Sequence, residues 1–352
     1  MNIKNTASPI LANSNFKPTP FYQNFDDFPQ KTNKTIEIVV VPKIPSTNNR
    51  QENIGITIDE NIILGILSKH YLNVVITEIN TQDDLNNLIL RKPDLVFSGV
   101  KYFHFNGKKI WLSDYLQSHG VGCIASNKKA LNNEYDKALA KDIMKKENIA
   151  TADYFVTKPG EYLTKESIPI KFPLFIKPLS SGDSIGIDAN SVVYDFKNFE
   201  AKVLDIYHNK KYHSLVEQYL SGKEYSVGIL VDKSNDSIQA MPIEIIVKPN
   251  KNGHCILDFD IKTNDYEKVV AVTDLKIHRQ LSDLAKNAFK ALGGELLGRI
   301  DIKMDSNKTP YFIEANLMPG LRKGYFYRAC LLNLDMSYEK MILTIAANGL
   351  SA

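Results

Sequence analysis

The feature that most constrains the fold is a regular alternation of β-branched runs and helical patterns in the first third of the chain. The runs that read as buried strands are residues 36–41, 73–79 and 94–98, and the helical patterns are residues 56–70, 83–90 and 110–118. Strands that alternate with helices form a parallel sheet, because each helix carries the chain back to the starting end of the sheet. The sequence therefore predicts a parallel α/β domain over residues 35–125, preceded by a loose polar extension over residues 1–34.

After residue 125 the pattern becomes richer in strands. We predict a central α+β lobe over residues 126–212 and a β-rich C-terminal lobe over residues 213–352. Asp274 is a good helix N-cap and Gly293 a good helix stop, so the helix between them has the best-defined ends. The other expected helices are residues 127–147, 196–207 and 338–347, and the expected strands are residues 172–177, 191–194, 214–218, 224–231, 238–247, 299–304 and 311–315.

The composition excludes several classes of protein. Lys and Arg number 43 against 40 Asp and Glu, so a net charge of +3 provides no broad field for nucleic acid or an anionic membrane. The three cysteines form no CxxC pair and the seven histidines no HExxH motif, which excludes a disulfide scaffold and a cysteine-rich zinc site. No apolar run approaches the ~20 residues that cross a bilayer, and the polar N-terminus lacks a signal-peptide core. The expected location is the cytoplasm.

Two carboxylates are predicted to face each other on the last pair of strands. Because side chains alternate across a strand, Arg299 and Asp301 share one face, and Glu314 and Asn316 share one face of the returning strand. If the strands pair about the centre of their turn, Asp301 lies opposite Glu314 and Arg299 opposite Asn316. Two carboxylates and an amide oxygen are hard donors that suit Mg²⁺. The alternative is a solvent-exposed strand face with weak surface ion pairs, which would have the same sequence pattern.

A loop with small hydroxyl residues follows the strand at residues 172–177. Lys177 ends this strand, and residues 178–186 read PLSSGDSIG, a composition that can place N–H groups around a phosphate. The segment matches neither GxxxxGK[ST] nor GxGxxG, so the Walker and Rossmann fingerprints are absent. Lys137, on the first turns of an expected helix, is a second candidate cation. The plain alternatives are a surface turn and a strand-end charge.

Several ordered motifs together resemble the ATP-grasp superfamily and, within it, the D-alanine–D-alanine ligase family. The matching stretches are EYDKALAK (134–141), FPLFIKPLSSGDSIGI (172–187), LVEQYLSGKEYSVGIL (215–230), MPIEII (241–246), LDFDIK (257–262), LGRIDIKMD (297–305) and YFIEANLMPGL (311–321). The resemblance covers residue 127 to the C-terminus, whereas the first 125 residues match only in their α/β pattern. It implies an ATP-grasp fold, with ATP between two β-rich lobes, and a homodimer formed through the first domain.

The resemblance also implies a reaction. The carboxylate of a first substrate attacks the γ-phosphate of ATP, and the amine of a second substrate displaces phosphate from the acyl phosphate to form an amide. The implied ATP-binding residues are Lys137, Lys177, Glu217, Gln218, Leu220 and Glu224; the implied ligands of two Mg²⁺ ions are Asp301, Glu314 and Asn316; and the implied catalytic residues are Arg299, Lys262 and Ser184. The lysines would contact phosphates, Glu217, Gln218 and Leu220 would form the adenine hinge, Glu224 would hold the ribose and Arg299 the oxyanion.

The substrate-side positions depart from the family pattern. Where the family carries a substrate-binding glutamate in an N-terminal lid, the only nearby acid is Glu52, and the tyrosine expected after the phosphate-contacting lysine is Thr263. In the central loop Ser184 keeps the second of two serines, but the first is replaced. The segment after residue 320 reads LRKGY, which is also the composition of a solvated basic loop. The candidate substrate residues are therefore Asp183, Arg322, Lys323 and Tyr325.

The leading hypothesis is an ADP-forming carboxylate–amine ligase that joins two amino acids or amino-acid-like acids other than two D-alanines. The rebuilt pockets favour it, because a site that pairs a given polar group rejects analogues without that group. The alternatives are a divergent D-alanine–D-alanine ligase of peptidoglycan synthesis and an ATP-binding pseudoenzyme. The expected partners are small carboxylate and amine substrates.

Overall fold

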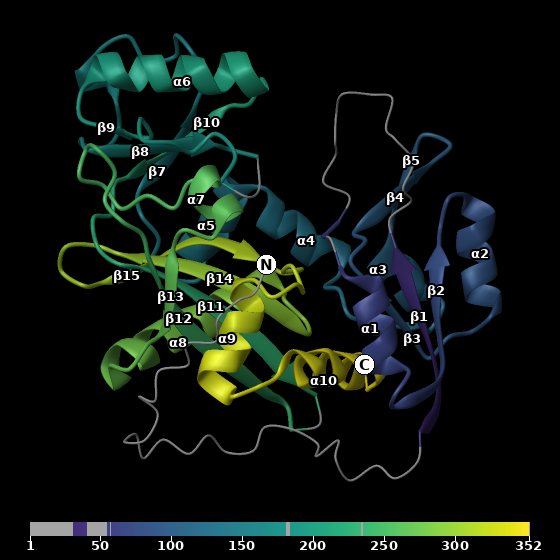
Figure 1. Cartoon of the computed structure of the whole chain (residues 1–352). Helices are drawn as coiled ribbons and strands as arrows, with labels where there is room; N and C mark the ends of the chain where they lie inside the picture. Colours follow the sequence, from purple (N-terminus) through teal and green to yellow (C-terminus); the bar gives the residue numbers. More distant parts are fainter. Residues whose placement is uncertain (1–30, 41–54, 57, 181–183, 234, 352) are drawn as a thin grey trace.

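The computed structural model describes residues 31–40, 55–56, 58–180, 184–233 and 235–351. Its N-terminal domain contains the predicted parallel sheet, in the strand order β2-β1-β3-β6. The strands are β1 (Thr32–Val40), β2 (Tyr71–Glu78), β3 (Leu95–Ser98) and β6 (Gly122–Cys123), and the helices are α1 (Glu60–Leu67), α2 (Gln82–Leu90) and α3 (Leu112–Ser118). A hairpin of β4 (Tyr102–Phe105) and β5 (Lys108–Trp111) projects from this domain (Figure 1).

Two details of the N-terminal domain differ from the prediction. The first strand begins at Thr32, inside the segment assigned to the loose extension, because its N–H bonds the His70 carbonyl at 2.9 Å and continues the ladder with β2. Residues 110–111 were expected to be helical but end β5, since they pair across the hairpin with β4. Residues 1–30, Glu52 and Asp183 lie outside the described part of the chain.

The central sheet is antiparallel, in the order β7-β10-β8-β9, with α6 packed on it (Figure 1). Its elements are β7 (Tyr154–Thr157), β8 (Leu174–Pro178), β9 (Val192–Val193), β10 (Ser214–Gln218) and α6 (Phe196–Lys210), with a 3₁₀ turn at Lys165–Ser167. The sequence boundary at residue 213 placed β10 in the C-terminal lobe, but the strand pairs with both β7 and β8. Pairing between distant segments is set by tertiary structure, and strand composition does not reveal it.

The C-terminal sheet is also antiparallel, in the order β13-β12-β11-β14-β15. Its strands are β11 (Glu224–Asp232), β12 (Ser237–Ile246), β13 (Lys268–Ala271), β14 (Leu297–Met304) and β15 (Pro310–Asn316), and its helices are α7 (Phe259–Asn264), α8 (Leu275–Leu292), α9 (Tyr325–Leu334) and α10 (Tyr338–Leu350). The predicted ends of α8 are confirmed: the Asp274 carboxylate accepts the first N–H groups, and Gly293 ends the helix at φ +84°. Helices α8 and α9 cover opposite faces of the sheet, since alternate residues of β11 pack into their two separate cores.

Residues 127–147, predicted to be one helix, form two helices, α4 (Lys128–Tyr135) and α5 (Lys137–Lys146). Asp136 between them has a non-helical ψ of 103°, and its carboxylate accepts the N–H groups of Ala138 and Leu139 at 2.9 and 3.1 Å. Both helices pack with α8 in the core of the C-terminal lobe, although the sequence assigned them to the central lobe. The break therefore places Lys137 as the first helical residue of α5.

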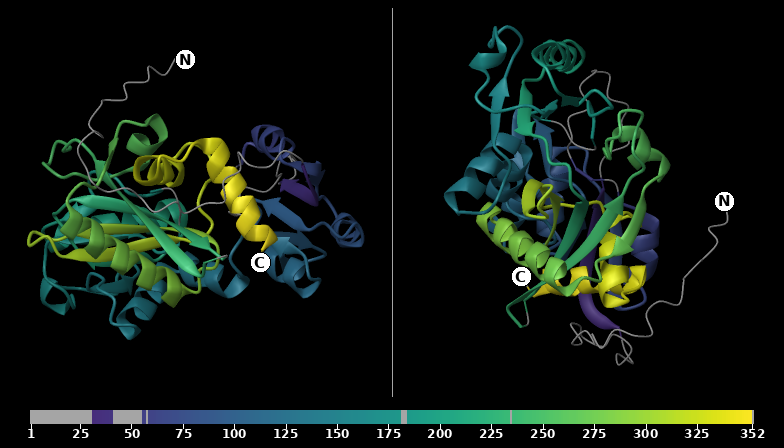
Figure 2. Two further views of the ribbon diagram at one scale, coloured as in Figure 1. Left: turned by 90° about the horizontal axis from the view of Figure 1, so that it is seen from below. Right: turned by 90° about the vertical axis from the view of Figure 1, so that its left-hand side faces the viewer.

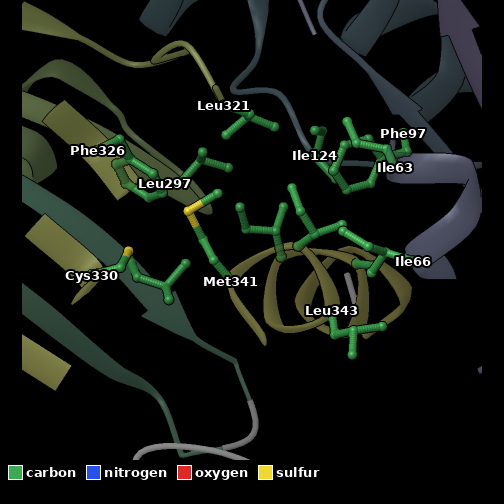
Figure 3. Packing of buried hydrophobic residues seen from close by; sticks show 14 of the residues in the cluster. Ile63, Ile66, Phe97, Ile124, Leu297, Leu321, Phe326, Cys330, Met341 and Leu343 are labelled. Carbon is green, nitrogen blue, oxygen red and sulfur yellow. The ribbon is translucent and has the colours of Figure 1, made fainter. Parts of the chain in front are cut away.

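One hydrophobic core joins the N-terminal domain to the C-terminal lobe. Most side chains labelled in Figure 3 come from α1, β3, β14, α9 and α10, and they include Ile63, Phe97, Leu297, Cys330 and Met341. Helix α10 lies between the two parts, as the view from below shows (Figure 2). The boundaries predicted from the sequence are therefore not boundaries between independent cores. Among the described helices none is long and apolar enough to cross a membrane.

Candidate active site

A cavity lies between the central and C-terminal sheets, and most of the predicted site residues line it. Its walls come from β8, β10, β11, β14 and β15, from helix α7, and from the loop residues around Ser184 and Leu257. The predicted residues on these walls are Lys177, Ser184, Glu217, Gln218, Leu220, Glu224, Lys262, Asp301 and Glu314. The remaining lining is largely apolar and includes Phe175, Ile256 and Phe312. Charged groups and apolar walls in one cavity suit a ligand with both a polyanionic and a flat aromatic part.

Glu217 joins two buried lysines. Its Oε1 lies 2.6 Å from Lys141 Nζ and its Oε2 lies 2.8 Å from Lys177 Nζ, and none of the three side chains is more than 7% exposed. Burial raises the pKa of Glu217, but the two lysines outweigh this and lower it below its usual value. Burial alone lowers the pKa of Lys177, whereas Glu217 and Glu314 raise it above its usual value. The arrangement therefore keeps Lys177 charged at the cavity wall.

Lys141 was missed by the sequence analysis. It lies one turn after Lys137 on α5, and its ammonium also donates to the Thr151 hydroxyl at 2.7 Å. Thr151 in turn donates to the carbonyl of Phe312 in β15 at 3.0 Å. The i, i+4 spacing of the two lysines, which places them on one helix face, was the available signal.

The predicted register of the last strand pair is confirmed. Asp301 lies opposite Glu314, and Arg299 lies opposite Asn316. An extra residue in β15, between Glu314 and Phe312, forms a bulge that shifts the rest of the ladder by one position. The two carboxylates thus come from adjacent strands on one wall of the cavity.

Glu314 is partly buried among cations. Burial raises its pKa, but Lys137, Lys177, Lys262 and Arg299 outweigh this effect and lower it to about 2. Lys137 is itself buried, and desolvation holds its pKa below the usual value despite the opposing charge of Glu314. Several cations around one carboxylate leave an excess of positive charge, which suits phosphate groups.

Arg299 and Asp301 form a bidentate pair. Nε donates to Oδ1 and Nη2 to Oδ2, both at 3.0 Å, and the Ser226 hydroxyl donates to Oδ1 at 2.6 Å. Burial lowers the pKa of Arg299, but Asp301 raises it above its usual value, so the guanidinium stays charged. Asp301 therefore has only its remaining lone pairs for a further ligand.

The oxygen donors present fit Mg²⁺ provided that phosphates and water complete its coordination. Asp301 and Glu314 supply carboxylates, and the Asn316 amide oxygen accepts the Met318 N–H at 3.2 Å. Within the described ranges no group of three or more His, Cys, Asp or Glu side chains gathers to hold an ion. Mg²⁺ is usually bound through one or two carboxylates together with substrate phosphates, so two carboxylates meet its requirement.

Lys303 is a second residue that the sequence analysis did not assign. It lines the cavity, donates to Glu224 Oε2 at 2.9 Å and to the Cys255 carbonyl at 3.2 Å. Its alternation with Asp301 on the same strand face was the signal for it. Ser184, in the central loop, donates its hydroxyl to the Leu257 carbonyl at 3.0 Å, so the loop contacts the C-terminal lobe above the cavity.

Some predicted residues lie away from the cavity wall. Arg322 and Lys323 are exposed, and Lys323 Nζ lies 5.8 Å from the ring centroid of Tyr338. Tyr325 begins α9, and its hydroxyl donates to Glu267 at 2.6 Å instead of reaching the cavity. The predicted residues that adjoin the lining without forming part of it are Lys137, Arg299 and Asn316.

Comparison with known proteins places this site in a family. The chain matches the sequence model described as "D-ala D-ala ligase C-terminus" over residues 143–347. It is 25% identical to D-alanine–D-alanine ligase A of Bacillus cereus, over 82% of this chain and 91% of that protein. It is 26% identical to the D-alanine–D-alanine ligase of Hydrogenovibrio crunogenus over 60% of this chain, and spans 64% of the length of that relative.

Solved structures show the same fold. D-alanine–D-alanine ligase from Bacillus anthracis, complexed with ATP, superposes with a TM-score of 0.65 at 18% identity, over 91% of this chain and 98% of that one. The VanG D-Ala:D-Ser ligase from Enterococcus faecalis superposes with a TM-score of 0.62 at 18% identity, over 90% and 100%. The predicted fold class, an α/β domain followed by the two lobes of an ATP-grasp fold, is confirmed.

Proposed function

The chain belongs to the D-alanine–D-alanine ligase family of ATP-grasp carboxylate–amine ligases, and we propose that it joins a carboxylic acid to an amine while converting ATP to ADP and phosphate. The observation that carries this proposal is the cavity between the two sheets, which places Lys177 and Lys262 beside the facing carboxylates Asp301 and Glu314. Phosphoryl transfer needs cations that neutralise the phosphate charge and carboxylates that can hold Mg²⁺, and this cavity brings both together.

In this proposal ATP occupies the cavity. The apolar lining around Leu220 contacts the adenine base. Glu224, which accepts a hydrogen bond from Lys303, also accepts hydrogen bonds from the ribose hydroxyls. Lys137, Lys177 and Lys262 offset the charge of the phosphates. Mg²⁺ would neutralise further phosphate charge, held by Asp301, Glu314 and the Asn316 amide oxygen.

The reaction follows from these positions. A carboxylate oxygen of the first substrate attacks the γ-phosphorus and ADP leaves, giving an acyl phosphate. The amine nitrogen of the second substrate then attacks the acyl carbon, loses a proton, and phosphate leaves as the amide forms. Arg299, charged and partly buried beside Asp301, stabilises the oxyanion of the second step. The cavity excludes water that would hydrolyse the acyl phosphate.

The more specific part of the proposal concerns which two substrates are joined. The proposal of substrates other than two D-alanines rests on the segment after residue 320, whose sequence LRKGY departs from the family pattern. The relatives described above are D-alanine–D-alanine ligases, so the plain ligase is the second candidate and D-alanine the first substrate to test. The cytoplasmic location and the homodimer remain predictions.

One measurement separates the candidates. ADP release is followed with Mg²⁺ and ATP across a matrix of carboxylic acids and amines that includes D-alanine, and each product is identified by mass. The proposal expects repeated turnover to ADP only when a carboxylate and an amine are both present, and an amino acid such as D-alanine supplies both groups. D-alanyl-D-alanine as the fastest product would establish the plain ligase, and ATP binding without ADP release from any pair would favour a pseudoenzyme.

Removing either facing carboxylate is predicted to stop turnover while the fold survives. Asp301→Asn and Glu314→Gln each delete a charge at the phosphate end of the cavity, so ADP release should fall by about 100-fold or more. Circular dichroism checks the fold, and Asp283→Asn, on the exposed face of α8, is the control expected to keep full activity. Full activity in both site variants would refute the metal and phosphate assignment.

A further inference from the structure

The buried Glu267 and the half-buried Tyr325 form a hydrogen-bonded pair that has no role in the proposed reaction. The Tyr325 hydroxyl donates to Glu267 Oε1 at 2.6 Å, and the Glu267 side chain is only 2% exposed. Its other oxygen has no hydrogen-bond partner among the described residues. Arg328 Nη1 lies 4.0 Å from Oε1, and Arg328 Nη2 donates to both carboxylate oxygens of Asp265, at 2.6 and 2.8 Å. The phenol is therefore the single direct donor that this buried carboxylate has within the described structure.

The Glu267 carboxylate should therefore form a strong hydrogen bond with the Tyr325 hydroxyl. A hydrogen bond to an ionised acceptor is about twice as strong as a neutral one, and a buried charge without a partner is costly. Burial raises the pKa of Tyr325, and the bond to Glu267 raises it further, so the phenol keeps the proton that it donates. The position of the Tyr325 ring is thus fixed at its hydroxyl end by Glu267.

The ring of Tyr325 lies against Arg299. Its centroid is 5.6 Å from Arg299 Cζ, a distance at which a guanidinium is attracted to an aromatic face. Nε and Nη2 of the guanidinium both donate hydrogen bonds to the Asp301 carboxylate. The charged group is therefore held by a carboxylate at its edge and by an aromatic ring, and Nη1 is the nitrogen that makes no hydrogen bond among the described residues.

We propose that Glu267, acting through Tyr325, is a positioning residue for Arg299, and that the Tyr325 hydroxyl does not bind a substrate. The inference rests on the proposed function in that it takes Arg299 to act on the reacting group. The ring limits rotation of the guanidinium, so that Nη1 meets the developing charge without reorganisation. Tyr325 is thereby reassigned from substrate binding to the support of Arg299.

Two substitutions that break the same bond from opposite ends test the proposal. Tyr325→Phe removes the donor and Glu267→Leu the acceptor, and each should lower kcat for ADP release by about tenfold because misplacement of a catalytic group slows the chemical step. The double variant should be no slower than the slower single variant, since one bond is lost in all three. KM for the amine should change by less than about threefold, because ground-state binding is not altered.

A hydroxyl that binds substrate would give a different pattern. Tyr325→Phe would then raise the KM for the amine, whereas Glu267→Leu, which frees the hydroxyl, would not, and this outcome would overturn the proposal. Tyr327→Phe is the matched control, since this tyrosine lies on the same helix and its ring contacts Tyr338 at 5.5 Å. Its kcat and KM should equal those of the unaltered protein.

A second readout does not depend on the substrates. In protein labelled with ¹⁵N-arginine, with the Arg299 signal assigned through Arg299→Lys, a held guanidinium gives separate Nη–H signals that merge in Tyr325→Phe. Averaged Arg299 signals in the unaltered protein would overturn the positioning role whatever the substrates are. Separate Arg299 signals without ADP release from any acid–amine pair would instead refute the proposed function, while the positioning of Arg299 by Tyr325 would stand.

Discussion

At the scale of single residues, the site depends on how its buried charges are shared. Each carboxylate oxygen of Glu217 forms an ion pair with a lysine, so this side chain acts mainly to hold Lys141 and Lys177 in place. In the proposed complex with ATP, an adenine amino group would therefore meet a carboxylate that two lysines already neutralise. Gln218 and Leu220 also line the cavity and remain the stronger candidates for contact with the base.

Loss of Lys141 should destabilise the protein and weaken ATP binding. Lys141→Met nearly keeps the length of the side chain but leaves the buried Glu217 with one of its two lysines, and the lost hydrogen bond to a charged group should cost about 1.5–3 kcal/mol. Urea unfolding and the Kd for ATP measure the two effects. Lys145→Met is the control, because Lys145 lies on the same helix, is 47% exposed and approaches Asp153 only to 3.8 Å. Equal stability losses in the two variants would contradict the role of the buried pair.

The charge of Glu314 predicts a dependence of stability on pH. Its pKa falls from 4.5 to about 2 on folding, so its contribution is complete above pH 4.5 and is lost as the pH falls towards 2. The difference in unfolding free energy between the unaltered protein and Glu314→Gln should therefore shrink over this range. Denaturant unfolding at several pH values checks it, with Glu339→Gln on the surface as the control. Parallel curves for the unaltered protein and Glu314→Gln would rule the prediction out.

At the scale of elements, the break between α4 and α5 connects helix capping to the site. Asp136 ends one helix and caps the next, whose first residue is Lys137. Because Lys137 is buried close to Glu314 and Lys177, the start of α5 must be held in place if the lysine is to contact the phosphates of the proposed ATP complex.

Removal of this cap should therefore affect both stability and function. Asp136→Ala should cost about 1 kcal/mol of unfolding free energy and raise the KM for ATP. Asp195→Ala removes the equivalent cap of α6, where Asp195 accepts the Asn198 N–H at 2.8 Å, away from the cavity lining. It should lose similar stability and leave the KM for ATP unchanged. A raised KM for ATP in both variants would show that the general loss of stability, and not the position of Lys137, is responsible.

At the scale of the whole molecule, the N-terminal domain and the C-terminal lobe are stabilised by a shared core. Helix α10 packs its apolar side chains between α1 and β3 on one side and the C-terminal sheet with α9 on the other (Figure 3). The two parts should therefore unfold together, because each would expose the shared part of its core to water if they separated.

Met341, fully buried in this shared core, provides the test. Met341→Ala leaves a cavity and should cost about 2–5 kcal/mol. The single tryptophan, Trp111, lies in the N-terminal hairpin and reports on that domain, while far-ultraviolet circular dichroism reports on all helices and sheets. Both signals should shift together in denaturant, whereas Leu332→Ala, on an exposed part of α9, should shift neither appreciably. Two separate transitions would show that the domains are independent.

Local pattern was sufficient for much of the fold. The parallel N-terminal sheet, the ends of α8 and the pairing of Asp301 with Glu314 were predicted because each depends on residues close together in the sequence or on strand alternation. The split at Asp136 was missed although the aspartate is a good cap, because the apolar periodicity on both sides suggested one helix.

The sequence by itself determined which side chains are available for phosphate and metal chemistry, and on which strands and helices they lie. Only the tertiary structure decided that β10 joins the central sheet, that Lys141 meets Glu217, and that Tyr325 is bonded to Glu267. These contacts join segments far apart along the chain, and their geometry is set by how sheets and helices pack. A pattern read along one segment contains no information about its distant partner, so charge pairing inside the site follows from the fold.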